Sequence, residues 1–338
     1  MVGNKLLISK YIVLAMTCWA LAACLSSPDC FREDVFCAAL VTDTLGIADH
    51  GINQDAWAGL QEASMNGLAD RVEFITSVDA RDYAKNITYF TDRGFDVIFT
   101  SGIALEDATL QSADLAPAAT FVGFNQTFAG SYPNLISVTF PEDQMGFAAG
   151  VSAAQLTQTG IVAAVCETSG IDAMWRYCEG FRAGVKFATS EIISLVVYRE
   201  NGDREKLFID EAWGYETATD LIRRGADVLF AAGGVTGQGA LKAASEFGVY
   251  AIGAERNQAA ALGESGSGVV TSFYGQTQFE AQEVMREVQQ GNIQNFRIGK
   301  IQFTALNPTF SPEFSLQMEV LLTALAKGEL EPTVTDPR

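Results

Sequence analysis

Residues 225–239 read GADVLFAAGGVTGQG, and this stretch indicates the fold class. The apolar run Asp227–Ala232 has the length of a strand and leads through a glycine-rich turn into a stretch of helical spacing. A strand that passes directly into a helix is the repeating unit of a parallel α/β sheet, which binds ligands beyond the carboxyl ends of its strands. Gly234 is therefore a candidate ligand-contact position, with a tight turn that contacts no ligand as the alternative. The glycines do not follow the G-x-G-x-x-G order and no Lys-Ser or Lys-Thr pair follows, so a phosphate loop is not indicated.

The same unit recurs along the whole chain. Apolar runs of strand length alternate with stretches of helical spacing, such as Gln54, Trp57 and Leu60. We therefore expect an α/β protein with two doubly wound parallel sheets of about five strands each and a short hinge near residues 158–160. The expected strands are Val35–Thr42, Val72–Thr76, Asp96–Thr100, Ala118–Phe124, Leu135–Phe140, Ile161–Cys166, Ile192–Tyr198, Asp227–Ala232, Val249–Ala254 and Val269–Phe273.

Composition excludes several classes of function. The chain has 41 Asp and Glu against 22 Lys and Arg, a formal net charge of −19. Binding to a nucleic acid backbone depends on Lys and Arg, so a nucleic acid polymer is not an expected partner. Because His50 is the single histidine, a His-rich zinc site is excluded and a Ser-His-Asp or Cys-His mechanism would depend on that one residue. We expect no enzymatic activity, no cofactor and no metal ion.

The N-terminus has the organisation of an export signal. Two lysines precede an apolar run at residues 11–20, which is too short to span a bilayer comfortably, and small residues lead into Cys24. Leu21-Ala22-Ala23-Cys24 resembles a bacterial lipobox, in which signal cleavage leaves the cysteine as a lipidated N-terminus. We therefore expect residues 1–23 to be a lipoprotein signal peptide and 24–34 a lipidated linker that holds the protein at the membrane outside the cytoplasm. An N-terminal membrane helix that stays attached is the alternative.

Four further cysteines follow the lipobox, at Cys30, Cys37, Cys166 and Cys178. Export to an oxidising compartment favours disulfides between them. Four thiols allow three pairings, of which Cys30 with Cys37 and Cys166 with Cys178 close the shortest loops. Four independent buried thiols are the alternative. A four-thiolate metal site is disfavoured because neither pair has the two-residue spacing of a zinc knuckle.

Residues 41–60, VTDTLGIADHGINQDAWAGL, resemble the opening motif of the basic membrane protein family of bacterial lipoproteins, the nucleoside-binding components of ABC importers. Residues 171–186 (IDAMWRYCEGFRAGVK), 225–239 and 249–258 (VYAIGAERNQ) follow in the family's order. The resemblance implies the type I periplasmic-binding-protein fold, in which two lobes joined by three crossing strands close on a ligand. The boundaries it implies are 35–157 plus 272–300 for lobe 1 and 158–271 plus 301–338 for lobe 2.

The resemblance also implies ligand-contact positions. Asp43 and Asn53 match polar residues that face the cleft from lobe 1, and Phe208 matches an aromatic residue that stacks on the nucleobase. Glu255 stands where the family usually has Asp, and Asn125 falls near another family Asp. Because Asp43 follows an apolar strand, where an unpaired carboxylate is costly, helix capping is the alternative to ligand contact.

Two positions depart from the family pattern. Ile52 occupies the place of a second stacking Phe, and Gly275 falls where many members have a sugar-binding Lys. Trp175 and Tyr274 are expected in connections that follow strands, where they could supply a new aromatic face and a hydroxyl donor to the ligand. Ordinary packing is the alternative for both.

The resemblance implies a substrate-binding lipoprotein that captures a small solute, in first place a purine nucleoside, and presents it to ABC permease and ATPase subunits. The departures at Ile52 and Gly275 keep another interpretation open. In that alternative the chain is a membrane-anchored sensory or surface-interaction lipoprotein with an altered ligand cleft.

Overall fold

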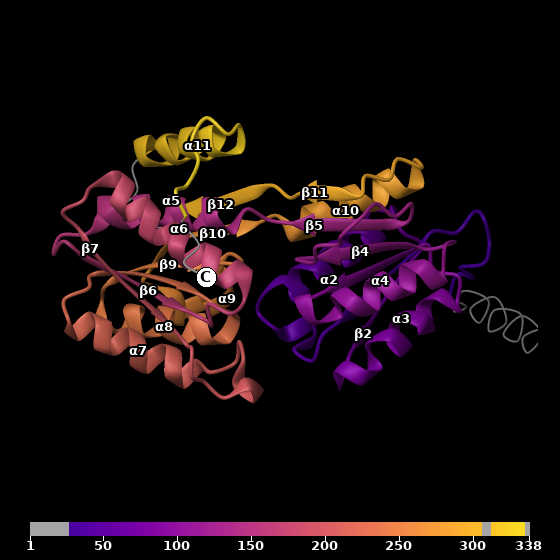
Figure 1. Cartoon of the computed structure of the whole chain (residues 1–338), viewed down its shortest axis with the longest axis horizontal. Coiled ribbons are helices and arrows are strands. Elements are labelled where there is room, and N and C mark those ends of the chain that lie inside the picture. The colour runs from indigo at the N-terminus through magenta and orange to yellow at the C-terminus, as the bar shows by residue number, and fades with distance from the viewer. Residues whose placement is uncertain (1–26, 306–311, 335–338) are drawn as a thin grey trace, which may run out of the picture.

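The computed structural model describes residues 27–305 and 312–334, so the expected signal peptide and Cys24 lie outside the described residues. The described chain forms two α/β lobes that lie side by side (Figure 1). Each lobe contains a six-stranded sheet, with the strand order β11-β5-β4-β3-β1-β2 in lobe 1 and β12-β10-β9-β8-β6-β7 in lobe 2. Within the described residues, no helix is both long and apolar enough to cross a membrane.

All of the expected strands form, and two short ones are added. The strands are β1 Cys37–Thr42, β2 Arg71–Thr76, β3 Val97–Ser101, β4 Thr120–Phe124, β5 Leu135–Thr139, β6 Ile161–Cys166, β7 Ile193–Tyr198, β8 Val228–Ala232, β9 Tyr250–Ala254, β10 Val269–Gly275, β11 Phe296–Ile298 and β12 Ile301–Ala305. The α-helices are α2 Ile52–Met65, α3 Tyr83–Thr91, α4 Glu106–Leu115, α5 Glu142–Leu156, α6 Asp172–Ala188, α7 Glu211–Arg223, α8 Gly234–Phe247, α9 Gln258–Leu262, α10 Thr277–Gln289 and α11 Pro312–Ala326. The edge strand β11 was not expected, because its Phe296 and Ile298 are exposed and it has no buried apolar run.

Both sheets are parallel except at β12, which pairs antiparallel with β10. The central strands are completely buried because helices cover both faces of each sheet. In lobe 1, α2 and α10 pack together on one face and α3 and α4 on the other. In lobe 2, α5 and α6 cover one face and α7 and α8 the other, while α11 packs on the outside of α5.

The helix pair α5–α6 corrects the expected lobe boundary. Residues 142–156 were expected in lobe 1, but α5 packs against α6 and against strands of the lobe 2 sheet. Glycines on the facing surfaces allow this close contact, since a Cβ at Gly146, Gly150, Gly180 or Gly184 would overlap the backbone of the other helix. The last residues of β10, also expected in lobe 1, pair with β12 in the lobe 2 sheet.

The hinge lies elsewhere than expected. Residues 158–160 form a loop within lobe 2, where the Asp227 carboxylate accepts hydrogen bonds from the backbone N–H groups of Gln158 and Thr159. The chain crosses between lobes instead after β5, after β10 and between β11 and β12. These three crossings meet at the ring of Phe140, which occupies the space that a Cβ would need at both Gly275 and Gly299.

Both local disulfides are present. Cys30 pairs with Cys37 at a Cα–Cα distance of 5.8 Å, and Cys166 pairs with Cys178 at 6.5 Å. The first ties the N-terminal segment to the start of β1. The second ties the carboxyl end of β6 to α6, so it fixes the helix relative to the edge of the sheet where ligands bind in this class of fold.

Gly150→Ala should destabilise the protein by about 1 to 3 kcal/mol, because the added methyl group would push α5 away from the backbone of α6. Urea unfolding followed by circular dichroism measures this. Gly170→Ala is the matched control, since its Cβ would make only an ordinary contact 3.4 Å from the Thr168 hydroxyl, and it should change stability by less than about 0.5 kcal/mol. Equal stability of both variants would contradict the packing argument.

Candidate functional site

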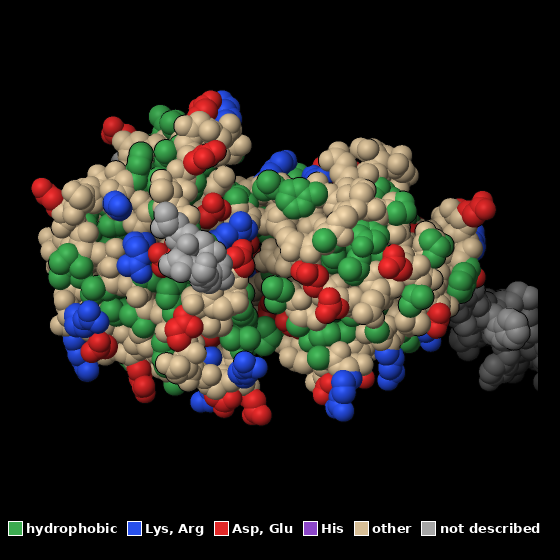
Figure 2. Space-filling view, viewed as in Figure 1, with side chains coloured by type: hydrophobic (Ala, Val, Ile, Leu, Met, Phe, Trp, Pro, Cys, Tyr) green, Lys and Arg blue, Asp and Glu red, His purple; other side chains and the backbone are tan. Residues whose placement is uncertain are grey.

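A cavity of about 200 Å³ lies between the lobes, at the carboxyl ends of their central strands. Figure 2 shows the two lobes meeting along a narrow seam on the visible face. In each sheet the strand order reverses beside the first strand. In lobe 1, β2 lies on one side of β1 and β3 to β5 on the other; in lobe 2, β7 lies on one side of β6 and β8 to β10 on the other. Open α/β sheets bind ligands at such a switch point. The lining residues are Asp43, Leu45, Asp49, Gly51, Ile52, Asn53, Gly102, Ile103, Glu106, Asn125, Thr127, Thr139, Glu142, Ile171, Asp172, Ala173, Met174, Arg176, Phe208, Gly234 and Glu255.

On the lobe 1 side, Asp43 follows β1 directly and Asn53 stands in the first turn of α2. The Asp43 carboxylate accepts hydrogen bonds from the Leu45 backbone N–H and from the Asn53 side-chain amide, both at 3.0 Å. Burial raises the pKa of Asp43, although these two donors lower it. Asp43 therefore serves local structure through Oδ1, while its position in the cavity wall also allows ligand contact.

Asp49 was not among the expected contact positions, yet it lines the cavity and occupies the N-terminus of α2. Its carboxylate accepts hydrogen bonds of 2.9 to 3.0 Å from the backbone N–H groups of Gly51, Asn53 and Gln54. Burial raises the pKa of Asp49, and the three donors lower it. The positive end of the α2 dipole is thus compensated by the protein itself.

Two side-chain oxygens in the wall are buried without a hydrogen-bond partner. They are Asn53 Oδ1 and Asn125 Oδ1. Asn53 uses its amide N–H groups on Asp43 and on the carbonyl of Gly46, which leaves the oxygen free to accept. A buried acceptor without a partner costs about 1 to 3 kcal/mol, so a ligand N–H or O–H group at this wall would recover that cost.

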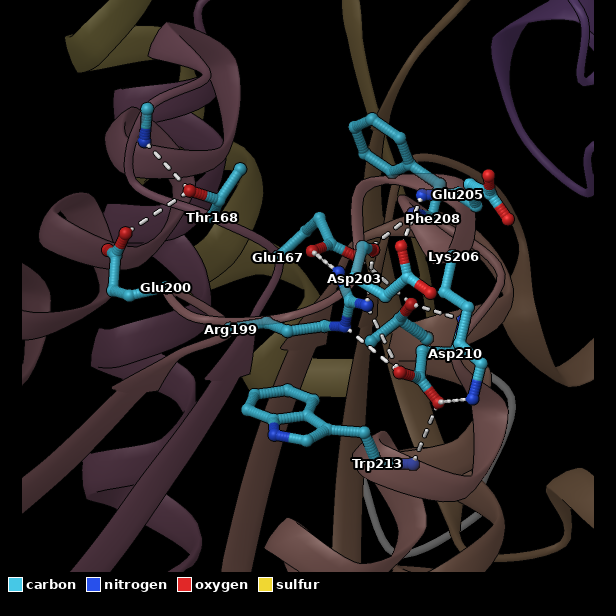
Figure 3. Close-up of polar contacts among 12 residues, drawn as sticks. Glu167, Thr168, Arg199, Glu200, Asp203, Glu205, Lys206, Phe208, Asp210 and Trp213 are labelled. Carbon is cyan, nitrogen blue, oxygen red and sulfur yellow. Dashed lines mark hydrogen bonds and ion pairs between the residues drawn. The ribbon is translucent and has the colours of Figure 1, made fainter.

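Phe208 enters the cavity from lobe 2 on a backbone that a network of charges holds in place. Its φ is 64°, a conformation that a bulky residue rarely adopts. The Phe208 N–H donates to Glu167 Oε2 at 2.9 Å, and its carbonyl accepts from the Val235 N–H at 2.8 Å. Figure 3 shows the buried Arg199 between Glu167 and Asp210, with N–O distances of 3.2 and 3.1 Å.

The Glu255 carboxylate holds the glycine-rich turn between β8 and α8 in place. Glu255 Oε2 accepts hydrogen bonds from the N–H groups of Gly233 and Gly234, at 2.9 and 2.8 Å, at the N-terminus of α8. Burial raises the pKa of Glu255, and the two N–H groups lower it. Gly234 lines the cavity as expected, but its N–H is already used by a carboxylate of the protein.

The backbone strain of the described residues gathers around this site. The non-glycine residues with positive φ are His50, Asn125, Phe208 and Glu255. Asn125, Phe208 and Glu255 line the cavity, and His50 lies in the loop that leads into α2. Strained backbone that the surrounding structure enforces is typical of ligand-binding sites.

Glu142 and Arg176 were not singled out from the sequence, yet both line the cavity. Glu142 begins α5 directly after the first crossing, and Arg176 is on α6, with Nη2 2.6 Å from Glu142 Oε2 and 3.2 Å from the Phe140 carbonyl oxygen. Glu142 is 3% exposed. Burial raises its pKa to about 7 although Arg176 lowers it. No local pattern identified this pair, because its members are 34 residues apart and meet only when α5 packs on α6.

Two expected ligand-contact residues lie outside the cavity. Trp175 is 7% exposed and buried, because the turn of α6 directs its neighbours Met174 and Arg176 toward the cavity and Trp175 away from it. Tyr274 lines a separate depression beside α10. Gly275 lies there as well, and the ring of Phe140 fills the space where the side chain of a lysine would begin.

The described residues that line the cavity include six acidic side chains and one arginine. Such a surface accepts hydrogen bonds from N–H and O–H groups and repels anions. Ile52, Ile103, Met174 and Phe208 supply apolar area for a flat or aliphatic part of a ligand. Within residues 27–305 and 312–334, no cluster of three or more potential metal-binding side chains occurs.

Glu142→Gln should weaken the dependence of stability on pH between about 4.5 and 7. The pKa of Glu142 is 4.5 unperturbed and about 7 when folded, so the folded state holds the proton more tightly. Its stabilising contribution is complete below pH 4.5 and is lost as the pH rises through 7, an effect of about 2 to 4 kcal/mol. Urea unfolding at several pH values measures it. Asp43, Asp49 and Glu255 also have raised pKa values and should preserve part of the slope, but an unchanged slope would contradict the assignment.

Curated relatives are between 24% and 30% identical to this chain over the aligned residues. An ABC transporter nucleoside-binding protein BmpA of Lactococcus lactis subsp. cremoris is 29% identical over 65% of this chain and 64% of its own. A CD4+ T-cell-stimulating antigen of Listeria monocytogenes is 30% identical over 66% of this chain and 63% of its own. The chain thus spans less than two thirds of the length of these relatives.

Solved structures share the fold. An ABC transporter solute-binding protein from Aeropyrum pernix has a TM-score of 0.74 at 17% identity, covering 90% of this chain and 94% of its own. A solute-binding protein from Conexibacter woesei has a TM-score of 0.72 at 22% identity, covering 89% and 99%. These likenesses confirm the two-lobed type I periplasmic-binding-protein fold. The family model described as ABC transporter substrate-binding protein PnrA-like matches residues 36–307, and the chain therefore belongs to the Bmp family.

Proposed function

We propose that this protein is the substrate-binding component of an ABC importer, and that it captures a purine nucleoside between its lobes. The observation that carries the proposal is the cavity, which combines the ring of Phe208 with unpaired oxygens of Asn53 and Asn125. A nucleoside offers a flat base for the ring and N–H and O–H donors for the oxygens. Membership of the Bmp family and the name of the Lactococcus relative support this substrate class.

The electrostatics of the cavity favour a nucleoside over a nucleotide. Helix N-termini are the usual phosphate sites of α/β proteins. At this cavity the N-terminal N–H groups of α2 and α8 are occupied by Asp49 and Glu255. A phosphate would have to displace a carboxylate that is already hydrogen-bonded, and it would face further acids at Glu106 and Asp172.

Binding without chemistry is part of the proposal. Three of the six carboxylates that line the cavity are engaged in structure: Asp49 and Glu255 hold helix N-termini, and Glu142 is paired with Arg176. A surface-interaction protein with a decayed cleft is less well supported, because the cavity is unfilled and polar groups converge on it. The ABC permease and ATPase subunits are the proposed partners.

The proposed ligand is tested by unfolding the protein in the presence of single solutes. Inosine, guanosine, adenosine, cytidine and uridine form the panel, with ribose and a nucleoside monophosphate as controls. A ligand at a hundred times its dissociation constant adds about 2.7 kcal/mol of stability. We expect the largest shift with a purine nucleoside and none with the monophosphate. No shift with any nucleoside would contradict the proposal.

Phe208→Ala should weaken nucleoside binding by more than roughly tenfold, since it removes both ring burial and stacking. Isothermal titration calorimetry measures the affinity. The hydrogen bonds that hold this segment involve the Phe208 backbone and remain available to alanine, so unfolding in the absence of ligand should show a folded protein. Unchanged affinity would remove Phe208 from the site.

The lipid anchor is the last part of the proposal. We propose that Cys24 is acylated and holds the protein outside the cytoplasm at the cell membrane. Cys24→Ser should shift the protein from the membrane to the soluble fraction or leave the signal uncut, as measured by fractionation and mass spectrometry. A variant that is still acylated and membrane-bound would exclude Cys24 as the lipid site.

A further inference from the structure

Arg256 joins the two lobes from outside the ligand cavity. It follows β9 in lobe 2, where its backbone N–H donates to the Ala254 carbonyl in a tight turn. Its guanidinium reaches α2 of lobe 1, with Nη1 2.6 Å from Gln54 Oε1 and Nη2 3.1 Å from Asp55 Oδ1. Arg256 does not line the cavity; it borders the separate depression that also contains Asp55 and Tyr274.

The residues on each side of this contact are next to cavity-lining residues in the chain. Arg256 follows Glu255, the carboxylate that holds Gly233 and Gly234 at the cavity wall. Gln54 and Asp55 follow Ile52 and Asn53, which line the cavity from α2. The bridge therefore connects the two walls one residue behind the surface that a ligand would touch.

The Arg256–Asp55 ion pair is largely buried, so we expect it to stabilise the closed lobes more than an exposed ion pair would. The Arg256 and Asp55 side chains are only 17% and 18% exposed. Burial raises the pKa of Asp55 to about 6, Arg256 lowers it, and the nearby Asp49 raises it. Without Arg256 the closed lobes would bury Asp55 beside a second acid with no cation, so Asp55 would have to take up a proton or carry an uncompensated charge. Opening the lobes would relieve either cost by hydrating the carboxylate.

We propose that Arg256, through Gln54 and Asp55, is a latch that holds the lobes closed and so sets ligand affinity and release without contacting the ligand. The inference depends on the proposed function only in that the cavity takes a ligand. Arg256 acts through lobe closure and is a positioning residue.

The decisive experiment measures lobe opening without any ligand. Small-angle X-ray scattering of Arg256→Ala should give a larger radius of gyration than that of the wild type. Arg182→Ala is the matched control, because it removes a cation that pairs with Glu179 within α6 and should scatter like the wild type. Superimposable curves for Arg256→Ala and the wild type, with both proteins folded by circular dichroism, would overturn the latch.

A second substitution, at Asp55, separates the latch from a general loss of structure. Arg256→Ala should accelerate guanosine dissociation about tenfold with little change in the association rate. Adding Asp55→Asn to Arg256→Ala should recover part of this loss, since no uncompensated charge then remains buried. Failure of the second change to recover any closure in scattering would contradict the charge argument. If the wild type does not bind guanosine while Arg256→Ala still has the larger radius of gyration, the nucleoside proposal is overturned and the latch is supported.

Discussion

The packing of one ring against two glycines determines how the two lobes are joined. Phe140 begins the first crossing, directly after β5, and its ring occupies the space beside Gly275 and Gly299, which belong to the other two crossings. A side chain at either glycine would collide with the ring, so all three positions depend on one another. Because the cavity lies between the lobes, its width depends on this hinge. Gly275, which the family resemblance aligned with a sugar-binding lysine, is part of the hinge packing in this chain.

The cavity is acidic because the protein fills its own helix N-termini. Asp49 and Glu255 accept the N–H groups that begin α2 and α8, one from each lobe. Both carboxylates are stabilised there by hydrogen bonds and by the helix dipoles. Anionic groups are therefore already present where many α/β proteins bind phosphate. The wall also carries the unpaired amide oxygens of Asn53 and Asn125 and several apolar side chains, which suit an uncharged ligand rich in hydrogen-bond donors.

On the lobe 2 side of the cavity, buried charged residues hold the strained backbone of Phe208 in place. Phe208 adopts its unusual backbone because Glu167 and α8 take up both its N–H and its carbonyl. Arg199 compensates Glu167 and Asp210 at the same time, which lets the Glu167 carboxylate remain fully buried while Asp210 is 14% exposed. The aromatic ring is thus presented by a rigid support, so less conformational entropy has to be lost when a ligand binds.

The sequence by itself predicted the alternation of strands and helices and favoured the two local disulfides. Of the nine expected contact positions, most of which the family resemblance implied, seven lie at the cavity. Asp43, Asn125, Gly234 and Glu255 come soon after strands, and the carboxyl ends of parallel strands share one edge of the sheet, so the local pattern is consistent with their place at the cavity. Only the tertiary structure decided that α5 belongs to lobe 2, that the hinge is at Phe140, that Trp175 turns away, and that Glu142 meets Arg176. Helix rotation and the contacts between distant segments depend on how side chains fill the space between elements, and no local pattern contains that information.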